Sequence, residues 1–348
     1  MWARTILGYY NSIHSEVELT PVSFDRRIDI KNDTGVIKRL LSALKEFLPA
    51  INQARKRLKT EKYDTVHIVT SASLSLIKDL VMIRLAHRYG AKAVIHFHFG
   101  RIPDLLIANG FESKLLRKVL KKADIAVTMD KKSFDALSDK GYSNIYYLPN
   151  PITESIIERA NLERQSIKRI SGKLLFVGQV LPTKGIYELV EACKSIKGIQ
   201  LHIIGNAQDS IKEDLNTRFG SGDSNYLLRG TLSRDEVFRE MMSAELFILP
   251  SYSEGFPNVV LEAMACHSPI IATTVGAIPE MLDIDGDACG VCVKPKDVEG
   301  LQKAIFFLLD NKQKANELSD KAFVRVKSFY STSVVWKQLI DIWQKAIA

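Results

Sequence analysis

Cysteine and long apolar runs are both scarce in this sequence. The 348 residues include four cysteines, too few and too unevenly placed for a disulfide framework, so we expect free thiols in a reducing compartment. No stretch approaches the roughly 20 apolar residues that span a bilayer, and the opening MWARTILGYY lacks the apolar stretch of a signal peptide. These absences predict a globular protein of the cytoplasm.

Patterns that bind metals are scarce as well. Cys289 and Cys292 form a lone CxxC, without the second ligand pair that a structural zinc site needs. We interpret them as small buried thiols. We therefore expect neither a metal nor another cofactor.

Length and charge indicate how the chain is organised. At 348 residues it has about twice the usual domain size, and a PNP turn at Asn150 suggests a break. We predict one domain at residues 1–150, a second at 151–330, and a helical segment, 331–348, that packs back toward the first. The excess of positive charge lies in the first domain, which has 25 Lys and Arg against 15 Asp and Glu; the remainder has 23 against 25.

Two basic clusters lie on helix-like segments of the first domain. They are Arg55, Lys56, Arg57 and Lys59, and Arg117, Lys118, Lys121 and Lys122. Such clusters suit a surface that meets anionic lipid headgroups, and they suit a solvated helix face equally well. An anionic membrane surface is thus one candidate partner, with the protein peripheral on the inner membrane face, whereas a nucleic acid is not expected.

Short β-rich runs alternate with amphipathic helical patterns, which indicates an α/β fold with parallel sheets. The runs begin at Thr65, Lys92, Asp124, Lys173, Gln200 and Leu246, and the helical patterns cover residues 35–58, 71–89, 131–140, 186–195, 233–243, 298–309 and 332–346. We expect right-handed crossovers to place helices on both faces of each sheet.

A glycine-bounded turn follows the run KLLFV. The sequence GQVLPTKG places Gly178 and Gly185 around a strand-to-helix turn that carries Lys184, before a helix that begins near Ile186. Backbone N–H groups at a helix start, the helix dipole and a nearby lysine all favour an anion. Because such turns occur in every doubly wound domain, this signal is weak by itself.

The most informative stretch, LFILPSYSEGFPNVVLEAMACHSPIIATTVGAIPEML, starts at Leu246. LFILP is a buried strand, SYSEGF is a turn, and Pro257 can start a helix because its missing N–H would be unpaired there. Glu262 falls in that helix among apolar residues, where a carboxylate needs hydroxyl groups or a cation. Glu254 precedes it by eight residues, and both can face one ligand at the carboxyl edge of the strand.

These motifs resemble the retaining glycosyltransferases of family 4, whose GT-B fold has two Rossmann-like domains across a cleft. The resemblance covers the second half through Glu254 and Glu262 in their EGFPNVVLEAMA setting. In the first half it rests on KYDTVHIVTS, VIHFHFG, KKADIAVTMDKKS and YYLPNP. It implies metal-independent transfer of a hexosyl unit from a nucleotide diphosphate sugar to a glycan or saccharide acceptor. The basic first domain suggests that the acceptor is a lipid-diphosphate-linked saccharide, as in cell-surface polysaccharide biosynthesis.

The resemblance also implies roles for single residues. Glu262 would hold the ribose hydroxyls, Glu254 would contact the transferred sugar, and Lys184 would neutralise the leaving diphosphate. His98 would line the opposite wall beside the donor sugar and completes the expected catalytic set with Lys184 and Glu254. The other expected donor-binding residues are Gly178, Gln179, Gly205, Arg229, Gly255, Phe256, Asn258 and Val259. A structural role explains Arg229, Asn150 and Glu280 as well as a functional one does.

One histidine pair has a separate interpretation. His96 and His98 are two residues apart on a strand, and we expect them to face opposite sides, so that one is a core histidine. Of the two, we favour His98 for function.

Two features depart from the family pattern. Gln179 stands where the family usually has an arginine on the donor phosphates, and a glutamine can hydrogen-bond a phosphate oxygen but cannot neutralise it. The opening WARTILGYY reads like the helix after the family's first strand and glycine-rich loop, so we expect that strand and loop to be missing. These departures leave an alternative open, a catalytically impaired donor-binding subunit that needs a partner.

Overall fold

The computed structural model describes residues 2–24, 36–164, 166–220 and 225–348, with only the backbone described for residues 36–46. The chain forms two compact units, Ala3–Pro149 with Trp336–Ala348, and Asn150–Val335. The division after Pro149 falls in the PNP turn of the sequence. No helix in the described part of the chain is both long and apolar enough to cross a membrane.

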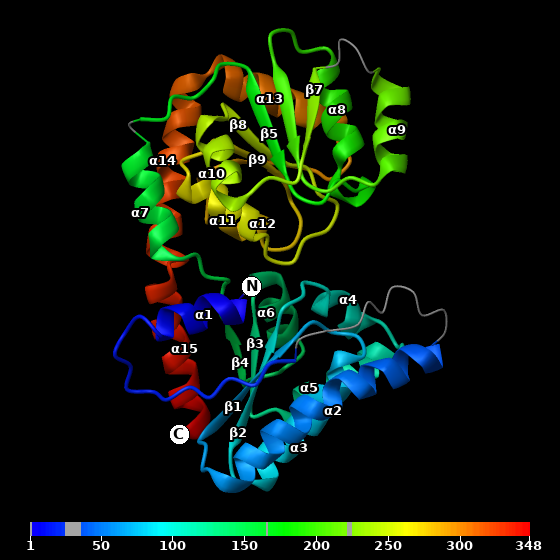
Figure 1. Ribbon diagram of the computed structural model, residues 1–348, viewed down its shortest axis with the longest axis vertical. Coiled ribbons are helices and arrows are strands. Elements are labelled where there is room, and N and C mark those ends of the chain that lie inside the picture. Colours follow the sequence, from blue (N-terminus) through cyan, green and yellow to red (C-terminus); the bar gives the residue numbers. More distant parts are fainter. Residues whose placement is uncertain (1, 25–35, 165, 221–224) are drawn as a thin grey trace. The chain divides into compact units, whose positions relative to one another are not determined.

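The first unit is built on four parallel strands in the order β1-β2-β3-β4 (Figure 1). The strands are β1 (Thr65–Thr70), β2 (Lys92–Phe97), β3 (Ile125–Thr128) and β4 (Ile145–Tyr147). The helices that precede or connect them are α1 (Trp2–Tyr10), α2 (Val36–Thr60), α3 (Ser75–Arg88), α4 (Ile102–Ile107), α5 (Phe111–Lys122) and α6 (Lys131–Asp139). Three of these strands lie where the β-rich runs predict them, and β4 is an additional strand.

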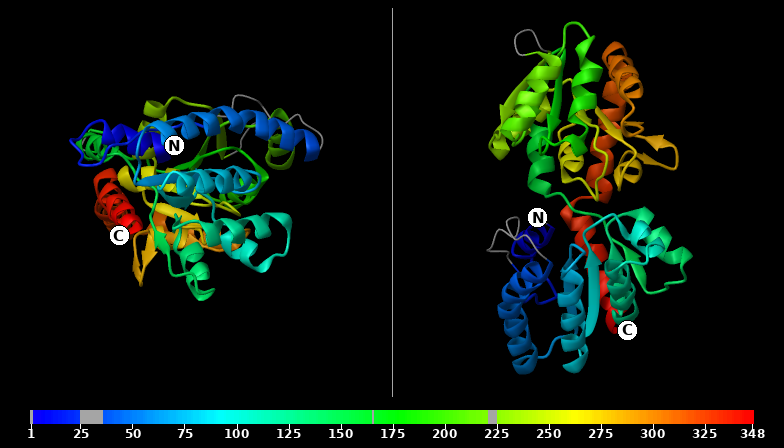
Figure 2. Two further views of the ribbon diagram at one scale, coloured as in Figure 1. Left: turned by 90° about the horizontal axis from the view of Figure 1, so that it is seen from below. Right: turned by 90° about the vertical axis from the view of Figure 1, so that its right-hand side faces the viewer.

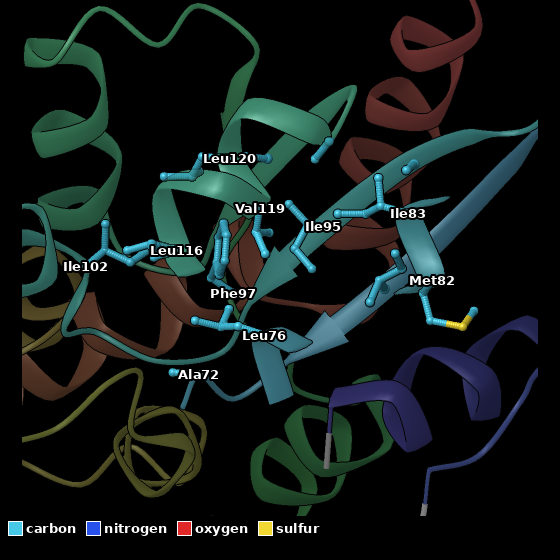
Figure 3. Close-up of a cluster of buried hydrophobic side chains, with 14 of the residues drawn as sticks. Ala72, Leu76, Met82, Ile83, Ile95, Phe97, Ile102, Leu116, Val119 and Leu120 are labelled. Atoms are coloured by element: carbon cyan, nitrogen blue, oxygen red, sulfur yellow. The ribbon is translucent and has the colours of Figure 1, made fainter. Parts of the chain in front are cut away.

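The helices that connect these strands pack on one face of the sheet. The buried cluster in Figure 3 takes Ile95 and Phe97 from β2, Leu76 and Ile83 from α3, and Leu116 from α5. Right-handed crossovers between strands that lie in sequence order send all connecting helices to the same side. The prediction that crossovers cover both faces is therefore wrong for this sheet.

The opposite face of this sheet meets the C-terminal helix α15 (Thr332–Ile347), which is red in Figures 1 and 2. Trp343 donates a hydrogen bond from Nε1 to Nδ1 of His67 on β1 at 2.9 Å. The Lys345 ammonium lies 5.2 Å from the ring centroid of Tyr146 on β4. This helix thus contacts both edge strands of the sheet.

The second unit has a sheet of six parallel strands in the order β12-β9-β8-β5-β6-β7. Its strands are β5 (Lys173–Val177), β6 (Gln200–Ile204), β7 (Tyr226–Gly230), β8 (Leu246–Leu249), β9 (Ile270–Thr273) and β12 (Val291–Val293), and β10 (Asp283–Ile284) pairs separately with β11 (Asp287–Ala288). The chain builds β5, β6 and β7 in one direction and then returns to place β8 on the other side of β5. The strand order therefore reverses between β5 and β8.

Helices of the second unit connect these strands. They are α7 (Glu154–Glu163), α8 (Ile186–Lys194), α9 (Asp209–Phe219), α10 (Arg234–Ser243), α11 (Asn258–Ala265), α12 (Ile278–Leu282), α13 (Val298–Asp310) and α14 (Lys312–Phe329), and a short 3-10 turn, η2, covers Pro182–Lys184. Sequence patterns predict α8, α10 and α13 to within one residue at each end. In the first unit the pattern 71–89 begins too early, because Ala72 and Ser73 adopt φ values of 72° and 60°, outside the helical region.

Candidate functional site

The reversal of strand order points to one edge of the second unit's sheet. In open parallel sheets, ligands bind at the carboxyl edge where the strand order reverses. Here that point lies between β5 and β8, whose carboxyl ends lead into residues 178–185 and 250–257. These two loops contain the predicted residues Gly178, Lys184 and Glu254.

Close backbone contacts hold the loop 178–185 in place. Gly205, after β6, has a φ of 148°, and a Cβ there would lie 1.7 Å from the carbonyl oxygen of Gly178. Gly185 has a φ of 71°, and its Cβ would lie 2.1 Å from the carbonyl oxygen of Pro250. Because only glycine fits at these two positions, the loop can lie directly against the ends of β6 and β8.

Lys184 and Glu254 form an ion pair that joins the two loops. Nζ of Lys184 lies 2.6 Å from Oε1 of Glu254, and Oγ of Ser251 donates to the same oxygen at 2.6 Å. Glu254 is 12% exposed and Lys184 is 24% exposed, so the pair is partly shielded from water and its attraction is stronger than at an open surface. Two of the three predicted catalytic residues therefore meet as partners of each other.

The turn that carries Glu254 is supported by the segment after β9. Gly276 has a φ of 56°, and a Cβ there would lie 2.4 Å from the carbonyl oxygen of Glu254 and 2.5 Å from that of Gly255. Ala277 donates its N–H to the carbonyl oxygen of Gly255 at 2.8 Å. The backbone of the two segments is thus in direct contact, which fixes the path of the Glu254 turn.

Asn150 supports the residues that follow this turn. Its Nδ2 lies 3.4 Å from the carbonyl oxygen of Phe256 and 3.3 Å from Oδ1 of Asn258. Phe256 is buried, and its ring packs edge-on against Tyr330 with centroids 5.8 Å apart. These contacts favour the structural explanation for Asn150.

The helix α11 begins directly after the turn and carries Glu262. The Glu262 side chain is 26% exposed, and its ion pair within the described residues is with Arg234, at 3.8 Å from Nη2 to Oε1. Burial raises the pKa of Glu262 above its usual range, and the charge of Arg234 opposes that rise. Hydrogen bonds from hydroxyl groups of a ligand would favour the charged form of this carboxylate.

The remaining predicted residues of the second unit are more dispersed. Val259 follows Asn258 in the first turn of α11, and Gln179 is exposed on the loop after β5. Nη2 of Arg229, on β7, lies 3.9 Å from Oε1 of Glu240, which also pairs with Lys173 and His202. Membership of this charge cluster favours the structural explanation for Arg229. Glu280 lies half-buried on α12.

His96 and His98 lie in the first unit, on the same side of its sheet. Their ring centroids are 4.2 Å apart, and Nδ1 of His96 lies 3.3 Å from Nε2 of His67. The prediction that they face opposite sides is wrong, because side chains alternate along a strand and residues two apart share a face. Burial lowers the pKa of His98 to about 4, so it is neutral at pH 7. Its place beside a donor sugar stays a prediction.

Three residues around the candidate site are absent from the sequence predictions. Ser251 donates to Glu254, Gly276 contacts the same turn, and Arg234 pairs with Glu262. Ser251 and Gly276 lie within the informative stretch that starts at Leu246, but only the folded chain shows what they touch. For Arg234 the sequence indicates only its position, because Ser233 is a capping residue and Arg234 opens α10 directly after it.

Comparison with known proteins finds a match in each half of the chain. The model for Glycosyltransferase Family 4 matches residues 18–155, and that for Glycosyl transferases group 1 matches residues 171–311. The MMP alpha-(1->4)-mannosyltransferase of Mycolicibacterium hassiacum is 30% identical over 185 residues, 52% of this chain and 44% of that protein. The capsular polysaccharide biosynthesis glycosyltransferase CapM of Staphylococcus aureus is 29% identical over 200 residues, 53% of this chain and 51% of that protein.

This chain thus spans about half the length of these two curated relatives. Among solved structures, HepE of Anabaena in complex with UDP shares the fold, with a TM-score of 0.68, 17% identity and coverage of 87% of this chain and 84% of that one. The fold is that of the GT-B glycosyltransferases. The chain has a Glycosyltransferase Family 4 domain in its first half and a Glycosyl transferases group 1 domain in its second half. The resemblance seen in the sequence is confirmed.

Proposed function

We propose that this chain is a retaining glycosyltransferase that takes a hexosyl unit from a nucleotide diphosphate sugar. The observation that carries the proposal is the Lys184–Glu254 pair at the point where the strand order reverses. Glu262, on the helix directly after the Glu254 turn, adds a second carboxylate near it in the chain. Relatives named as glycosyltransferases, and the UDP complex of HepE, support this reading.

Each of these groups has a proposed task. Glu262 accepts hydrogen bonds from the ribose hydroxyls, Glu254 accepts hydrogen bonds from the transferred sugar, and Lys184 lies against the diphosphate. Carboxylates suit hydroxyl donors, and an ammonium group suits phosphate oxygens. The glycine-held loop 178–185 and the amino end of α11 supply backbone N–H groups for the phosphates.

In the proposed reaction the protein contributes position and charge. The bond from the anomeric carbon to the diphosphate oxygen breaks as the acceptor oxygen bonds on the same face, and the departing diphosphate takes the acceptor's proton. Lys184 and the starts of α8 and α11 stabilise the negative charge that develops on the diphosphate. Because Gln179 adds no charge, Lys184 contributes most of the neutralisation. In this scheme the reaction needs no metal.

We also propose an anionic membrane surface as the place where the first unit works, with a lipid-linked saccharide as acceptor. The α4–α5 region exposes Ile107 by 80% and Phe111 by 66%, and α5 carries Lys118, Lys121 and Lys122. Apolar side chains beside lysines suit the boundary between headgroups and acyl chains. Arg117 has another task, because it donates to the carbonyl oxygens that end α4.

A sedimentation experiment with liposomes tests this surface. Vesicles with anionic lipid should bind the protein more strongly than neutral vesicles, and the double variant Ile107→Ser, Phe111→Ser should reduce that binding. A variant with Phe306→Ser and Phe307→Ser, exposed by 41% and 47% in the second unit, serves as the control for lost apolar surface. Equal binding to both vesicle types would contradict the proposal.

A panel of UDP-, GDP- and ADP-sugars tests the proposed activity. Release of the nucleoside diphosphate is measured with and without an extract of lipid-linked acceptors, for the unmodified protein and for Glu262→Ala. Release that needs the acceptor and is lost in the variant would identify both the reaction and the donor. Absence of release with every donor would contradict the proposed activity.

The second candidate is a donor-binding subunit that turns over only with a partner protein. The observation that favours it is Gln179, which leaves the loop after β5 with one cation fewer than the family pattern has. Donor binding by the pure protein without release, followed by release when a cell extract is added, would support this candidate over the first.

A further inference from the structure

Oε1 of Glu254 receives two donors. Nζ of Lys184 and Oγ of Ser251 each lie 2.6 Å from it. Ser251 is completely buried, whereas Lys184 is 24% exposed. The serine hydroxyl therefore belongs to the interior of the second unit, and the lysine can still meet a ligand.

The two donors differ in what a bound ligand would do to them. A diphosphate carries more negative charge than one carboxylate, so it competes with Glu254 for Lys184. Once Lys184 turns toward the phosphates, Glu254 loses one of its two donors at Oε1. If Lys184 were the only donor to Oε1, the Glu254 side chain would then be free to change rotamer at the moment when it must meet the sugar.

Ser251 is well placed to prevent that movement, because its own backbone is fixed. Oγ1 of Thr273 donates to the carbonyl oxygen of Ser251 at 2.5 Å. The next residue, Tyr252, donates its N–H to the carbonyl oxygen of Thr183 at 2.9 Å. The serine thus sits on a segment anchored to β9 on one side and to the lysine-bearing loop on the other.

We propose that Ser251 is a positioning residue for Glu254: its hydroxyl keeps Oε1 in place when Lys184 exchanges the carboxylate for the donor diphosphate. The other oxygen, Oε2, would then be available to accept hydrogen bonds from hydroxyl groups of the transferred sugar. This inference rests on the proposed function. It assigns Ser251 to recognition of the sugar rather than of the nucleotide.

Binding measurements with matched ligands test the assignment. Affinities for UDP-glucose and UDP, and for GDP-mannose and GDP, are measured by titration calorimetry for the unmodified protein and for Ser251→Ala. The quantity of interest is the ratio of the sugar nucleotide affinity to the plain nucleotide affinity. In Ser251→Ala this ratio should fall about tenfold, because one hydrogen bond to a charged group is lost, while the affinity for the nucleotide alone should change less than about twofold.

Two further variants separate positioning from general damage. Ser251→Cys keeps the size of the side chain and a weak donor, so its ratio should lie between those of the other two proteins. Ser268→Ala removes another buried serine hydroxyl of the same unit, which donates to the carbonyl oxygen of Met241 at 2.9 Å, and should leave the ratio unchanged.

The outcomes are distinct. An unchanged ratio in Ser251→Ala, or an equal loss for sugar nucleotide and plain nucleotide, would overturn the role of Ser251 and leave the proposed function standing. If the unmodified protein binds no sugar nucleotide of the UDP, GDP and ADP panel, the proposed function fails, and this inference fails with it.

Discussion

Glu262, the carboxylate that we propose for the ribose hydroxyls, is a residue whose charged form is disfavoured by burial. Burial raises the pKa of this carboxyl group, so the folded chain holds its proton more tightly than the unfolded chain does. Between the pKa of Glu262 in the unfolded chain and its higher pKa in the folded chain, the contribution of Glu262 to stability therefore falls as pH rises. At pH 7 the charged form is disfavoured by the fold, and a ligand with hydroxyl groups would relieve that cost.

We expect Glu262→Gln to stabilise the free protein and to weaken donor binding. The neutral amide removes the buried charge, and we expect a gain of about 1 kcal/mol in the free energy of unfolding, measured by urea denaturation at pH 7. Donor affinity should drop at least about tenfold. Glu299→Gln is the control, since Glu299 is 75% exposed and forms only a surface ion pair; it should change stability by less than about 0.5 kcal/mol and leave donor affinity unchanged. Lower stability in Glu262→Gln would contradict this account.

Gly276 offers a test of the backbone contact beneath Glu254. A Cβ at this position would lie 2.4 Å from a carbonyl oxygen, so Gly276→Ala must move the Glu254 turn. Gly286→Ala is a matched control, because its φ of 86° is equally left-handed and nothing lies within 4 Å of its Cβ. We expect the control to cost about 1 kcal/mol of stability for its φ alone. Gly276→Ala should cost roughly 1–3 kcal/mol more, from overpacking, and should also weaken binding of a sugar nucleotide.

At the scale of elements, the sequence predicts that the segment 331–348 packs back toward the first domain but does not predict which face of the sheet α15 meets. Its apolar face is visible in the sequence, but that face meets a sheet whose strands lie within residues 65–147. The Trp343–His67 hydrogen bond, for example, joins residues 276 positions apart. The helices that connect the strands all cover one face of the sheet. The opposite face, which carries His67, is therefore left for α15. The topology of the first unit therefore explains why a C-terminal helix packs there.

Trp343→Phe should weaken the contact between α15 and β1 but keep most of its apolar packing. The phenyl ring keeps most of the apolar volume and removes the indole N–H, so His67 loses its donor and unfolding should become easier by about 1 kcal/mol. Hydrogen exchange at the amides of β1 should speed up in the variant. Gln344→Ala is the control, because Gln344 is an exposed residue of the same helix, and it should change stability by less than about 0.5 kcal/mol. Unchanged exchange at β1 would contradict the role given to Trp343.

At the scale of the whole molecule, buried histidines predict how stability depends on pH. The pKa is lowered by burial to about 3 in His67, to about 4 in His98 and to about 4 in His267, and His96 is lowered well below its usual range. An unfolded chain binds protons at these residues near pH 6.5. Below that pH the unfolded state therefore holds more protons than the folded state, and stability falls as pH falls.

Urea denaturation between about pH 6.5 and pH 5 measures this effect, because histidine protonation dominates in that interval. Each such histidine contributes a slope of up to about 1.4 kcal/mol per pH unit. His98→Asn should reduce the slope, and His14→Asn, at an exposed position, should leave it unchanged. An unchanged slope in His98→Asn would contradict the effect given to the burial of His98.

The sequence by itself determined the local features of this protein. The alternation of strands and helices, the glycine-bounded turn with Lys184, and the strand, turn and helix that carry Glu254 and Glu262 all follow from patterns within about 40 residues. Backbone preferences and side-chain periodicity act between residues that are close in the chain, so a single sequence is enough to predict their effects. The same short patterns carry the resemblance to the family, which the comparisons confirm for each half.

Only the tertiary structure decided which of these segments meet. Strand order placed β8 beside β5, and that neighbourhood joins Lys184 to Glu254 across 70 residues and brings Gly276 against the Glu254 turn. The packing of α15 on the face of the first sheet that carries His67 arises in the same way. Such contacts depend on how the segments pack and on which face each connection takes, and no local pattern carries that information.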